Sequence, residues 1–330
     1  MPILSDLFLK KVMLPRLEHI KKMEDELADR PEQIQPLEDA PVRFNHPERA
    51  VQRVLAGKMD LKGMVTPRLA PLFLSSMLGV LKANKSIEEN PAHPRTEITR
   101  TEIEELQALA TSLNCLVGFA KLDQLYIFKG KSISFDNSIV LAMEMEADAI
   151  ATAPSYAANY EVQRIYRDLG EAGNIIADWL RKRGFACHAV PPRNGLTLHP
   201  PMAVKAGLGY FGLHGLCISE EFGPRIRVSA VHTNITNLPF YEGHDHDWIA
   251  DYCEKCKLCI EACPGDAFYD PPIPRDNGIV THVDQEKGFP FFAENHGCAV
   301  CISSGPFSKV DYHKLKEAVA EDLSPNSSHL

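Results

Sequence analysis

The chain has 330 residues, an apolar content of 45%, a charged content of 24% and a net charge of −9. This length allows one large domain or two medium ones with a sizeable core, and the composition is ordinary for a soluble globular protein. An acidic protein gains no bulk electrostatic attraction to nucleic acid or to an anionic membrane. The charge therefore argues against a nucleic-acid partner.

The N-terminal segment shows no targeting pattern. No basic segment precedes its apolar residues, and no small-residue cleavage site follows them. The longest apolar stretch, 69–81, is shorter than the ~20 residues that a membrane helix needs, and it contains Pro71, Ser75 and Ser76. The sequence therefore predicts a buried helix at 69–81 and a cytoplasmic protein without a membrane partner.

The chain divides into four parts. Residues 1–98 are rich in charge and proline and predict a helical N-terminal extension, with short helices near 47–56 and 69–81. Residues 99–242 carry a periodic α/β pattern, 243–312 carry most of the cysteines, and 313–330 form a tail whose end, 324–330, has the composition of a disordered segment.

The pattern of 99–242 predicts a sheet with covering helices, which places the chain in the α/β (α+β) class. Thr101 and Glu104 fit a capping box at a helix start, and Gly184 fits a left-handed cap at a helix end. The expected helices and strands, in chain order, are a helix from 101, strands at 115–120 and 138–145, a helix at about 157–183, and strands at 185–190, 216–219 and 225–233 with a tight hairpin turn at 220–224. Segment 248–310 shows little regular pattern and cannot bury much core by itself.

Nine cysteines in a cytoplasmic chain are not expected to form disulfides. Three of them, Cys115, Cys187 and Cys217, are isolated in apolar sequence and predict small buried core residues. The other six lie between 253 and 301. Their clustering indicates metal ligation.

The strongest motif is CEKCKLCIEACP, a C-x2-C-x2-C-x3-C-P run formed by Cys253, Cys256, Cys259, Cys263 and Pro264. Thiolates suit iron–sulfur clusters because soft sulfur matches iron and bridging sulfide. Three closely spaced cysteines wrap one cluster, and in two-cluster ferredoxins the fourth ligates the other cluster. The competing interpretation is a zinc site, which favours paired C-x2-C units separated by a longer gap.

A second segment, HGCAVCISSGPFS, repeats the motif in part. Cys298 and Cys301 are followed by Gly305 and Pro306, so a glycine stands where a third cysteine is expected. Upstream, Gly288 occupies another expected cysteine position. The six thiolates would then divide into Cys253, Cys256 and Cys259 for one cluster and Cys263, Cys298 and Cys301 for the other.

Each such cluster lacks one protein ligand, since glycine has no side chain. An open iron could take water, a substrate, or a nearby side chain such as His282, Asp284 or His296. A three-iron cluster and a decayed site are further alternatives. The sequence therefore predicts one or two [4Fe–4S]-type clusters and leaves their number and missing ligands open.

The chain resembles the epoxyqueuosine reductases and the respiratory reductive dehalogenases over about 135–310. The motifs that carry the resemblance are AGLG at 206–209, GLHG at 212–215, EFGPR at 221–225 and the cysteine segment. The resemblance implies a cobalamin-binding domain of nitroreductase-like architecture followed by a ferredoxin-like segment with two [4Fe–4S] clusters, which pass electrons to the cobalt.

Several features depart from both families. Arg193 stands where epoxyqueuosine reductases carry an acidic residue, their proposed proton donor, and the C-terminal helical-repeat region of those enzymes is missing. The twin-arginine export signal of the dehalogenases is also missing, and six cluster cysteines replace the usual eight. The resemblance therefore identifies the superfamily and neither named activity.

Two groups of candidate residues lie in the resembling region. Dense glycines let backbone approach a planar ligand, although tight turns explain them equally well. The candidate cofactor contacts are Gly207, Gly209, Gly212, Gly215 and Arg225. A reductive step also needs a proton, and the candidate donors are Tyr156, Tyr160, Tyr210 and His214, with Arg227 as a possible anion holder.

The leading hypothesis is an iron–sulfur oxidoreductase. Its clusters would relay electrons from a donor such as ferredoxin or flavodoxin to a cofactor, with cobalamin the candidate, for reduction of a small organic substrate. The alternatives are a non-catalytic iron–sulfur protein for electron transfer or redox sensing, and a structural zinc protein.

Overall fold

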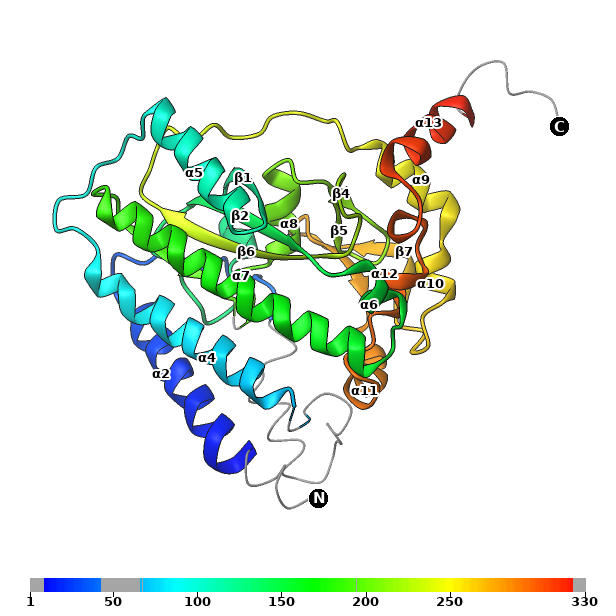
Figure 1. Ribbon diagram of the computed structural model, residues 1–330, viewed down its shortest axis with the longest axis horizontal. Coiled ribbons are helices and arrows are strands. Elements are labelled where there is room, and N and C mark those ends of the chain that lie inside the picture. Colours follow the sequence, from blue (N-terminus) through cyan, green and yellow to red (C-terminus); the bar gives the residue numbers. More distant parts are fainter. Residues whose placement is uncertain (1–8, 43–65, 67, 194, 323–330) are drawn as a thin grey trace.

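The computed structural model describes residues 9–42, 66, 68–193 and 195–322 (Figure 1). The predicted helix near 47–56 and the tail 324–330 lie outside these residues. The elements of the N-terminal part and the sheet region are η1 (Leu9–Met13), α2 (Leu14–Ala28), α4 (Ala70–Lys85), η2 (Ser86–Glu89), α5 (Arg100–Ser112), β1 (Cys115–Lys121), η3 (Gln124–Tyr126), β2 (Asn137–Glu144), α6 (Ala147–Ala151), α7 (Tyr156–Lys182), β3 (Cys187–Val190), α8 (His199–Lys205), β4 (Tyr210–Phe211), β5 (Cys217–Ile218) and β6 (Ile226–Thr233). They are followed by α9 (Trp248–Cys256), α10 (Leu258–Glu261), β7 (Phe268–Pro274), β8 (Val280–Val283), α11 (Gln285–Glu294), α12 (Val300–Ser304), η4 (Pro306–Ser308) and α13 (Tyr312–Asp322).

The central sheet has the strand order β1-β2-β6-β3, and every neighbouring pair is antiparallel. Strand β2 lies in the middle and six of its eight residues are buried, because both faces of the sheet are covered. The continuous apolar run of this strand is what predicted it, and the expected α/β class is confirmed as a mixed α/β fold.

Helix α7 covers one face of the sheet together with α5, and α4 and α2 lie beside it in turn (Figure 1). Its N-cap is Ser155, whose hydroxyl accepts a hydrogen bond from the Ala158 amide at 3.1 Å. It ends before Gly184, whose φ of 86° is the predicted left-handed cap. The opposite face packs on α8 and the segment before β2. The predicted helices at 69–81 and 157–183 are therefore present.

The start of α5 differs from the prediction. Its capping box is formed by Thr99 and Glu102: the Glu102 amide donates to the Thr99 hydroxyl, and the Glu102 carboxylate accepts from the Thr99 amide. The expected pair of Thr101 and Glu104 is wrong by two residues. Arg95 explains the choice, because its guanidinium pairs with the Glu102 carboxylate at 2.9 Å and lowers the pKa of Glu102 to about 2.

The strand predicted at 216–219 does not join the central sheet. Strand β5 pairs with β4, while β6 pairs with β2 and β3. The predicted tight turn is present, because the amides of Ser219 and Gly223 each donate to the other's carbonyl, at 2.9 and 3.0 Å. The two segments diverge beyond this turn, so they do not form a hairpin.

The expectation of little regular structure in 248–310 is wrong. Helices α9 to α12 and the β7–β8 hairpin gather at one end of the molecule (Figure 1). A small core also lies here, formed by residues of α9, η4 and α13 with Ile218 of β5, and Cys253 belongs to it. Since α12 also packs against α6, the parts on either side of residue 243 share their packing.

The three isolated cysteines are buried, as predicted, and burial raises the pKa of each to about 12. Their thiols are therefore inert core groups. Within the described part of the chain, no helix has the length and apolar character required to span a membrane.

Two histidines face each other across neighbouring strands inside the sheet. His188 of β3 pairs in register with His232 of β6, and both are fully buried. His232 Nδ1 lies 2.8 Å from the Ser138 hydroxyl, and His188 Nε2 donates to the Asn84 side-chain oxygen at 3.3 Å. Burial lowers the pKa of His188 to about 4 and that of His232 well below 6.5.

These histidines make stability depend on pH. Between pH 6.5 and about 4 the unfolded chain binds protons at His188 and the folded chain does not, so stability is constant above this range and falls as the pH drops through it. We expect a loss of about 1 kcal/mol for this residue between pH 7.5 and 5.5 in anaerobic urea unfolding. His188→Gln should flatten the slope, and His93→Gln, at an exposed site, should not; equal slopes in both variants would contradict the assignment.

Candidate iron–sulfur site and adjoining pocket

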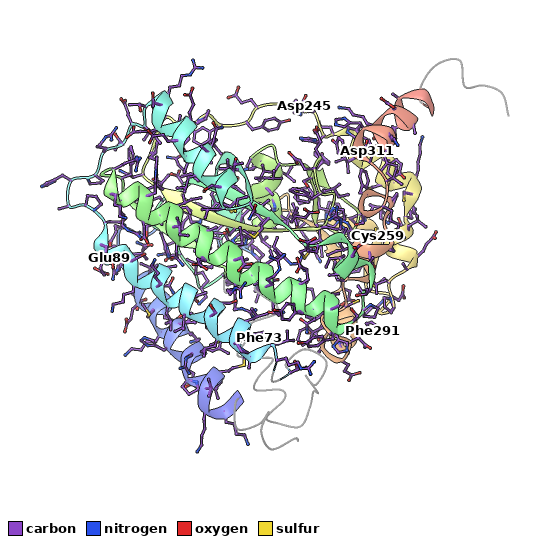
Figure 2. The ribbon with its side chains drawn as sticks, in the orientation of Figure 1. Phe73, Glu89, Asp245, Cys259, Phe291 and Asp311 are labelled. Carbon is purple, nitrogen blue, oxygen red and sulfur yellow. The ribbon has the colours of Figure 1, made fainter. Side chains whose placement is uncertain are left out.

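The first cysteine run forms two short helices joined by one left-handed residue. Cys253 and Cys256 lie on α9, and Cys259 lies on α10. Lys257 adopts φ 50° between the two helices. A non-glycine residue with positive φ is uncommon, and such residues concentrate at functional sites. The turn places the three thiols around one space, at the end of the molecule where Figure 2 labels Cys259.

The second cysteine segment has the same local conformation. Ala299 follows Cys298 with φ 73° and begins α12, which carries Cys301. The hydrogen bonds match as well: the Ile260 amide donates to the Lys257 carbonyl at 2.9 Å, and the Ile302 amide donates to the Ala299 carbonyl at 3.1 Å. The two stretches are therefore structural copies, as the partial sequence repeat suggested.

The thiols affect one another's pKa in two groups. The neighbouring thiols of Cys256 and Cys259 raise the pKa of Cys253, whereas the Cys263 thiol raises the pKa of Cys298. The pKa of Cys301 is raised by the thiols of Cys298, Cys259 and Cys263. Cys301 is thus influenced by Cys259 of the first group as well as by Cys263 and Cys298, and the division into three and three stays a prediction. Among the described residues, no three His, Cys, Asp or Glu side chains converge on a single ion.

Burial is the main influence on these thiols. It raises the pKa of Cys253 and Cys301 to about 12 and that of Cys259 to about 11. Backbone amides oppose it, because the Leu213 amide donates to the Cys253 sulfur and the His214 amide to the Cys259 sulfur. The thiols of Cys253, Cys259 and Cys301 are thus protonated at neutral pH, and cluster assembly has to displace their protons. Soft sulfur donors at ferredoxin-type spacing fit an iron–sulfur cluster.

The two glycines at expected ligand positions have different surroundings. Gly305 lines the same space as Cys253, Cys256 and Cys259, and a Cβ placed on it would find its nearest atom, the Cys301 carbonyl oxygen, at 3.8 Å. A Cβ on Gly288 would lie 3.1 Å from the Ala267 Cβ. A side chain therefore fits at residue 305 and is crowded at residue 288.

Two of the suggested substitute ligands already have partners. His282 Nδ1 donates to the Leu213 carbonyl at 3.0 Å and its ring stacks on Phe211. Asp284 caps α11 by accepting from the amides of Glu286 and Lys287, at 3.1 and 3.2 Å. Asp284 therefore has a structural role at a helix start.

The predicted proton donors are not brought together. Tyr156 and Tyr160 stand one turn apart on α7, and Tyr160 is 42% exposed. Tyr210 lies on β4, and His214 is buried beside the first group of thiols, where burial lowers its pKa to about 4. Their catalytic role stays a prediction.

The candidate cofactor glycines contact the chain itself. A Cβ on Gly207 would meet the Tyr241 ring at 2.5 Å, and one on Gly209 would meet the Ile218 carbonyl at 2.0 Å. Gly212 and Gly215 are similarly close to His214 and to His282. These glycines let loops pack closely, which was the alternative explanation, and a cofactor contact stays a prediction.

Arg225, the fifth candidate, pairs with Glu144 at 2.5 Å and donates to the Met145 carbonyl at 3.1 Å. These partners join the start of β6 to the end of β2. The geometry gives Arg225 a structural role.

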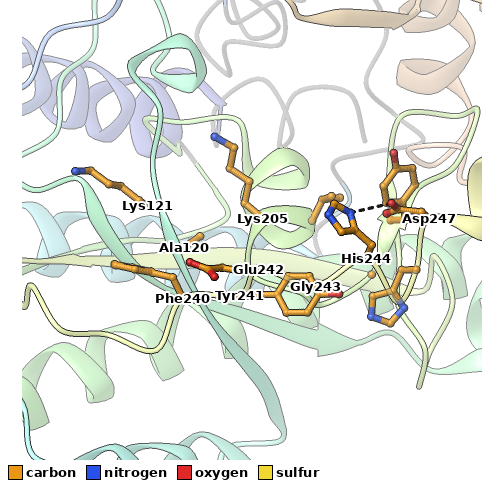
Figure 3. Close-up of a pocket in the computed structure, with 13 residues that line it drawn as sticks. Ala120, Lys121, Lys205, Phe240, Tyr241, Glu242, Gly243, His244 and Asp247 are labelled. Atoms are coloured by element: carbon orange, nitrogen blue, oxygen red, sulfur yellow. Dashed lines mark hydrogen bonds and ion pairs between the residues drawn. The ribbon is translucent and has the colours of Figure 1, made fainter.

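A polar cavity of about 530 Å³ lies beside Tyr210 (Figure 3). Its lining includes Lys121, Lys205, Glu242 and Asp247, so its charges are mixed. The two histidines that precede the cysteine run, His244 and His246, have different partners. His244 is exposed and pairs with Asp247 at 2.9 Å, whereas His246 is buried and accepts at Nδ1 from the Tyr312 hydroxyl, 2.7 Å away. They do not form a joint metal site.

A smaller cavity of about 250 Å³ lies between residues of α7, α8 and β6. Tyr166 of α7, His199 at the start of α8, and Arg227 of β6 supply its polar lining. Apolar walls come from residues such as Phe128 and Leu198. The described residues that line this cavity include no acidic side chain, so their net charge is positive.

Arg227 connects this cavity to the thiols. Its guanidinium lies 5.6 Å from the Tyr166 ring centroid, and its positive charge lowers the pKa of Cys301 against the larger effect of burial. Its Nε is buried without a hydrogen-bond partner, and within the described ranges no carboxylate pairs with it. A nearby negative charge would stabilise this half-buried cation.

Sequence reasoning found only part of this cavity. Arg227 was a candidate anion holder, whereas Tyr166 and His199 were not among the candidate residues. Arg193 was the residue in the sequence that could have pointed to this cavity, because it stands where the resembling reductases carry their proposed proton donor. Its guanidinium lies 5.1 Å from the Tyr166 ring centroid and donates a hydrogen bond to Gln163. Tyr166 therefore lies between two guanidinium groups.

Residues 246–269 match the family model of the 4Fe-4S binding domain. Over 197 residues the chain is 34% identical to the tetrachloroethene reductive dehalogenase of Dehalobacter restrictus. This alignment covers 56% of this chain and 34% of that protein. It is 23% identical over 176 residues to the epoxyqueuosine reductase of Atelocyanobacterium thalassa, covering 50% and 54%. A solved reductive dehalogenase, described as suggesting a mechanism for B12-dependent dehalogenation, aligns with a TM-score of 0.59 at 16% identity over 83% of this chain and 43% of that chain.

The chain therefore combines a mixed α/β fold with a segment of the 4Fe-4S binding type. Over about half of its length the chain is similar in sequence to reductive dehalogenases and to epoxyqueuosine reductases. The alignments span about a third to a half of the curated relatives' own length.

Single cysteine replacements test the division of the thiols. Cys253→Ala and Cys301→Ala should each lower the iron and acid-labile sulfide of anaerobically purified protein to roughly half, since each removes a ligand of a different cluster. The matched control is Cys115→Ala, at a buried core cysteine, which should leave both contents unchanged. A full loss from one replacement and none from the other would show a single cluster instead.

Proposed function

We propose that this chain is an iron–sulfur oxidoreductase in which two clusters pass electrons to a site beside Arg227, where a small organic substrate is reduced. Cobalamin is the proposed intervening cofactor, and a ferredoxin or flavodoxin is the proposed electron donor. The match to the 4Fe-4S binding domain and the relationship to reductases and reductive dehalogenases support the class of reaction.

The position of Arg227 is the observation that carries this proposal. Its positive charge lowers the pKa of Cys301, and its side chain also lines the cavity that contains Tyr166 and His199. An electron arriving at a cluster held by Cys301 therefore meets a positive charge at the wall of a ligand-sized cavity. Such a charge stabilises both the reduced cluster and an anionic group in the cavity.

The cavity side chains supply what a reductive step needs besides electrons. The Tyr166 hydroxyl and the His199 imidazole both line it, and either type of group donates a proton to a reduced substrate. The His199 ring is held close to the backbone, because a Cβ on Gly195 would lie 2.9 Å from it. Apolar walls at Phe128 and Val228 limit the entry of water.

Cobalamin is proposed from the fold relationship rather than from a fitted cradle. The cavity of about 250 Å³ suits a small organic molecule and is smaller than a corrin ring requires. The described residues alone therefore do not enclose that cofactor, and the roles given above concern only protons, charge and water at the chain's own side chains. The solved neighbour described as B12-dependent is what supports this cofactor.

A non-catalytic redox-sensing protein is the second candidate function. Gly305 and Gly288 favour it, because they leave each predicted cluster with three protein thiolates, and incompletely ligated clusters are labile. In that case the clusters are reducible but the cavity beside Arg227 takes no cofactor.

A cobalamin titration separates the two functions. Protein reconstituted anaerobically with iron and sulfide should shift the optical spectrum of cob(II)alamin at stoichiometric protein if the oxidoreductase proposal holds. Protein with full cluster content that leaves the cobalamin spectrum unchanged would remove the cofactor and favour the sensor.

Replacement of Arg227 tests its electrostatic role. Arg227→Gln should make the reduction potential of one cluster more negative by on the order of 50 mV, because an added electron loses a nearby positive charge, and Arg227→Lys should keep most of the wild-type value. The control is Arg225→Gln, whose guanidinium is already paired with Glu144. A redox titration followed by EPR that gives the same potential for all four proteins would exclude this role.

A further inference from the structure

The two cysteine stretches correspond residue by residue from the left-handed residue onward, while the cysteine before it differs, since Cys298 has φ 52° and Cys256 ends helix α9. Residues 256–264 and 298–306 both contain a cysteine, a left-handed residue, a short helix with a second cysteine, and a proline at the end. The amides of Glu261 and Ser303 each donate to the left-handed residue's carbonyl at 3.1 Å. In this correspondence Gly305 is the counterpart of Cys263.

The equivalence also relates the two groups of thiols. Cys263 lies on the first stretch but is grouped with Cys298 of the second stretch, because its thiol raises the pKa of Cys298. Its counterpart should therefore face Cys253, Cys256 and Cys259, and Gly305 does line that space. The position that would complete the first group of ligands is thus identified, and it carries no side chain.

The side chains around this position have other partners. The His214 Nδ1 atom accepts from the Leu216 amide at 3.1 Å, so the proton of the neutral ring is on Nε2 and no lone pair remains for iron. The Lys257 ammonium pairs with Asp270 at 2.7 and 3.0 Å. The Tyr252 hydroxyl bonds to the Cys256 sulfur. Among the described residues lining the space, only the three cysteines therefore offer a ligand.

We propose that the cluster at Cys253, Cys256 and Cys259 has one iron without a protein ligand, facing Gly305, and that this iron is lost on oxidation and regained on reduction. This inference rests on the clusters of the proposed function. A one-electron oxidant takes one electron from [4Fe–4S]2+, and the resulting [4Fe–4S]3+ divides into [3Fe–4S]+ and Fe2+. Charge and atoms balance, and all three Fe–S(Cys) bonds remain. The lost iron leaves by breaking its bonds to three bridging sulfides, which stay with the remaining irons, and its water-derived terminal ligand leaves with it.

The backbone at residue 305 makes a sharp test feasible. Gly305 has φ −69° and ψ 149°, a conformation open to any residue, and the space next to it accepts a Cβ. Gly305→Cys supplies the missing thiolate, and Gly305→Ala supplies the Cβ without sulfur. The pair separates ligation from packing.

The measurement is made in a Cys301→Ala background, so that only the first group of thiols reports. Ferricyanide is added anaerobically, released Fe2+ is counted with a ferrous chelator, and the EPR spins of [3Fe–4S]+ are integrated. The reference protein and Gly305→Ala should release one iron per cluster and show one spin per cluster, whereas Gly305→Cys should release several-fold less iron and show several-fold fewer spins.

A second readout protects the test against a Gly305→Cys protein that does not fold. Full-length wild-type protein is oxidised, reduced with dithionite and given 57Fe2+, and its Mössbauer spectrum should place the label in one iron site per cluster. Label scattered over all sites, or equal iron release from the reference protein and from Gly305→Cys, would overturn the inference while the clusters stand. Protein without acid-labile sulfide in any variant would instead remove the proposed function itself.

Discussion

The gathering of six cysteines at one end of the molecule is the constraint on which the rest of this structure depends. Buried thiols are held in the protonated form, as the raised pKa values of Cys253 and Cys301 show. They also leave little apolar core around them. Segment 248–310 has to gain its cohesion from short helices placed by left-handed residues and from bonds to metal, because its own apolar surface is small. The amides of Leu213 and His214 extend the same constraint into the α/β part, since they donate to the sulfurs.

Charge balance relates the thiols to the cavity beside them. The chain is acidic overall, yet Arg227 is placed without a carboxylate partner among the described residues. Metal-bound thiolates are negative, so the arginine has its counter-charge only when the site is assembled. Tyr166 and Arg193 lie in the same neighbourhood, and they would respond to the same change in charge.

The sequence predicted the elements whose signals are local. The buried run of β2, the long stripe of α7 with Gly184 at its end, and the inert cysteines were all found from residue patterns. The errors concern pairing and competition at a distance. Arg95 selected a different capping box, and β5 turned away from β6 to pair with β4. No local pattern contains that information.

In the candidate site, too, some residues could be predicted from local sequence patterns and others could not. Cysteine spacing was sufficient to propose the ligands, whereas the cavity at Arg227 arises from α7, α8 and β6, which are far apart in the chain. Tyr166 has helical spacing typical of a core residue, so its position between two guanidinium groups was hidden by the stripe. The repeat of the cysteine stretches lies between these cases. Its sequence showed a glycine in place of a cysteine, but only the shared conformation of Lys257 and Ala299 makes Gly305 the structural counterpart of Cys263. The missing ligand is thereby assigned to residue 305, next to which the structure has space for a side chain.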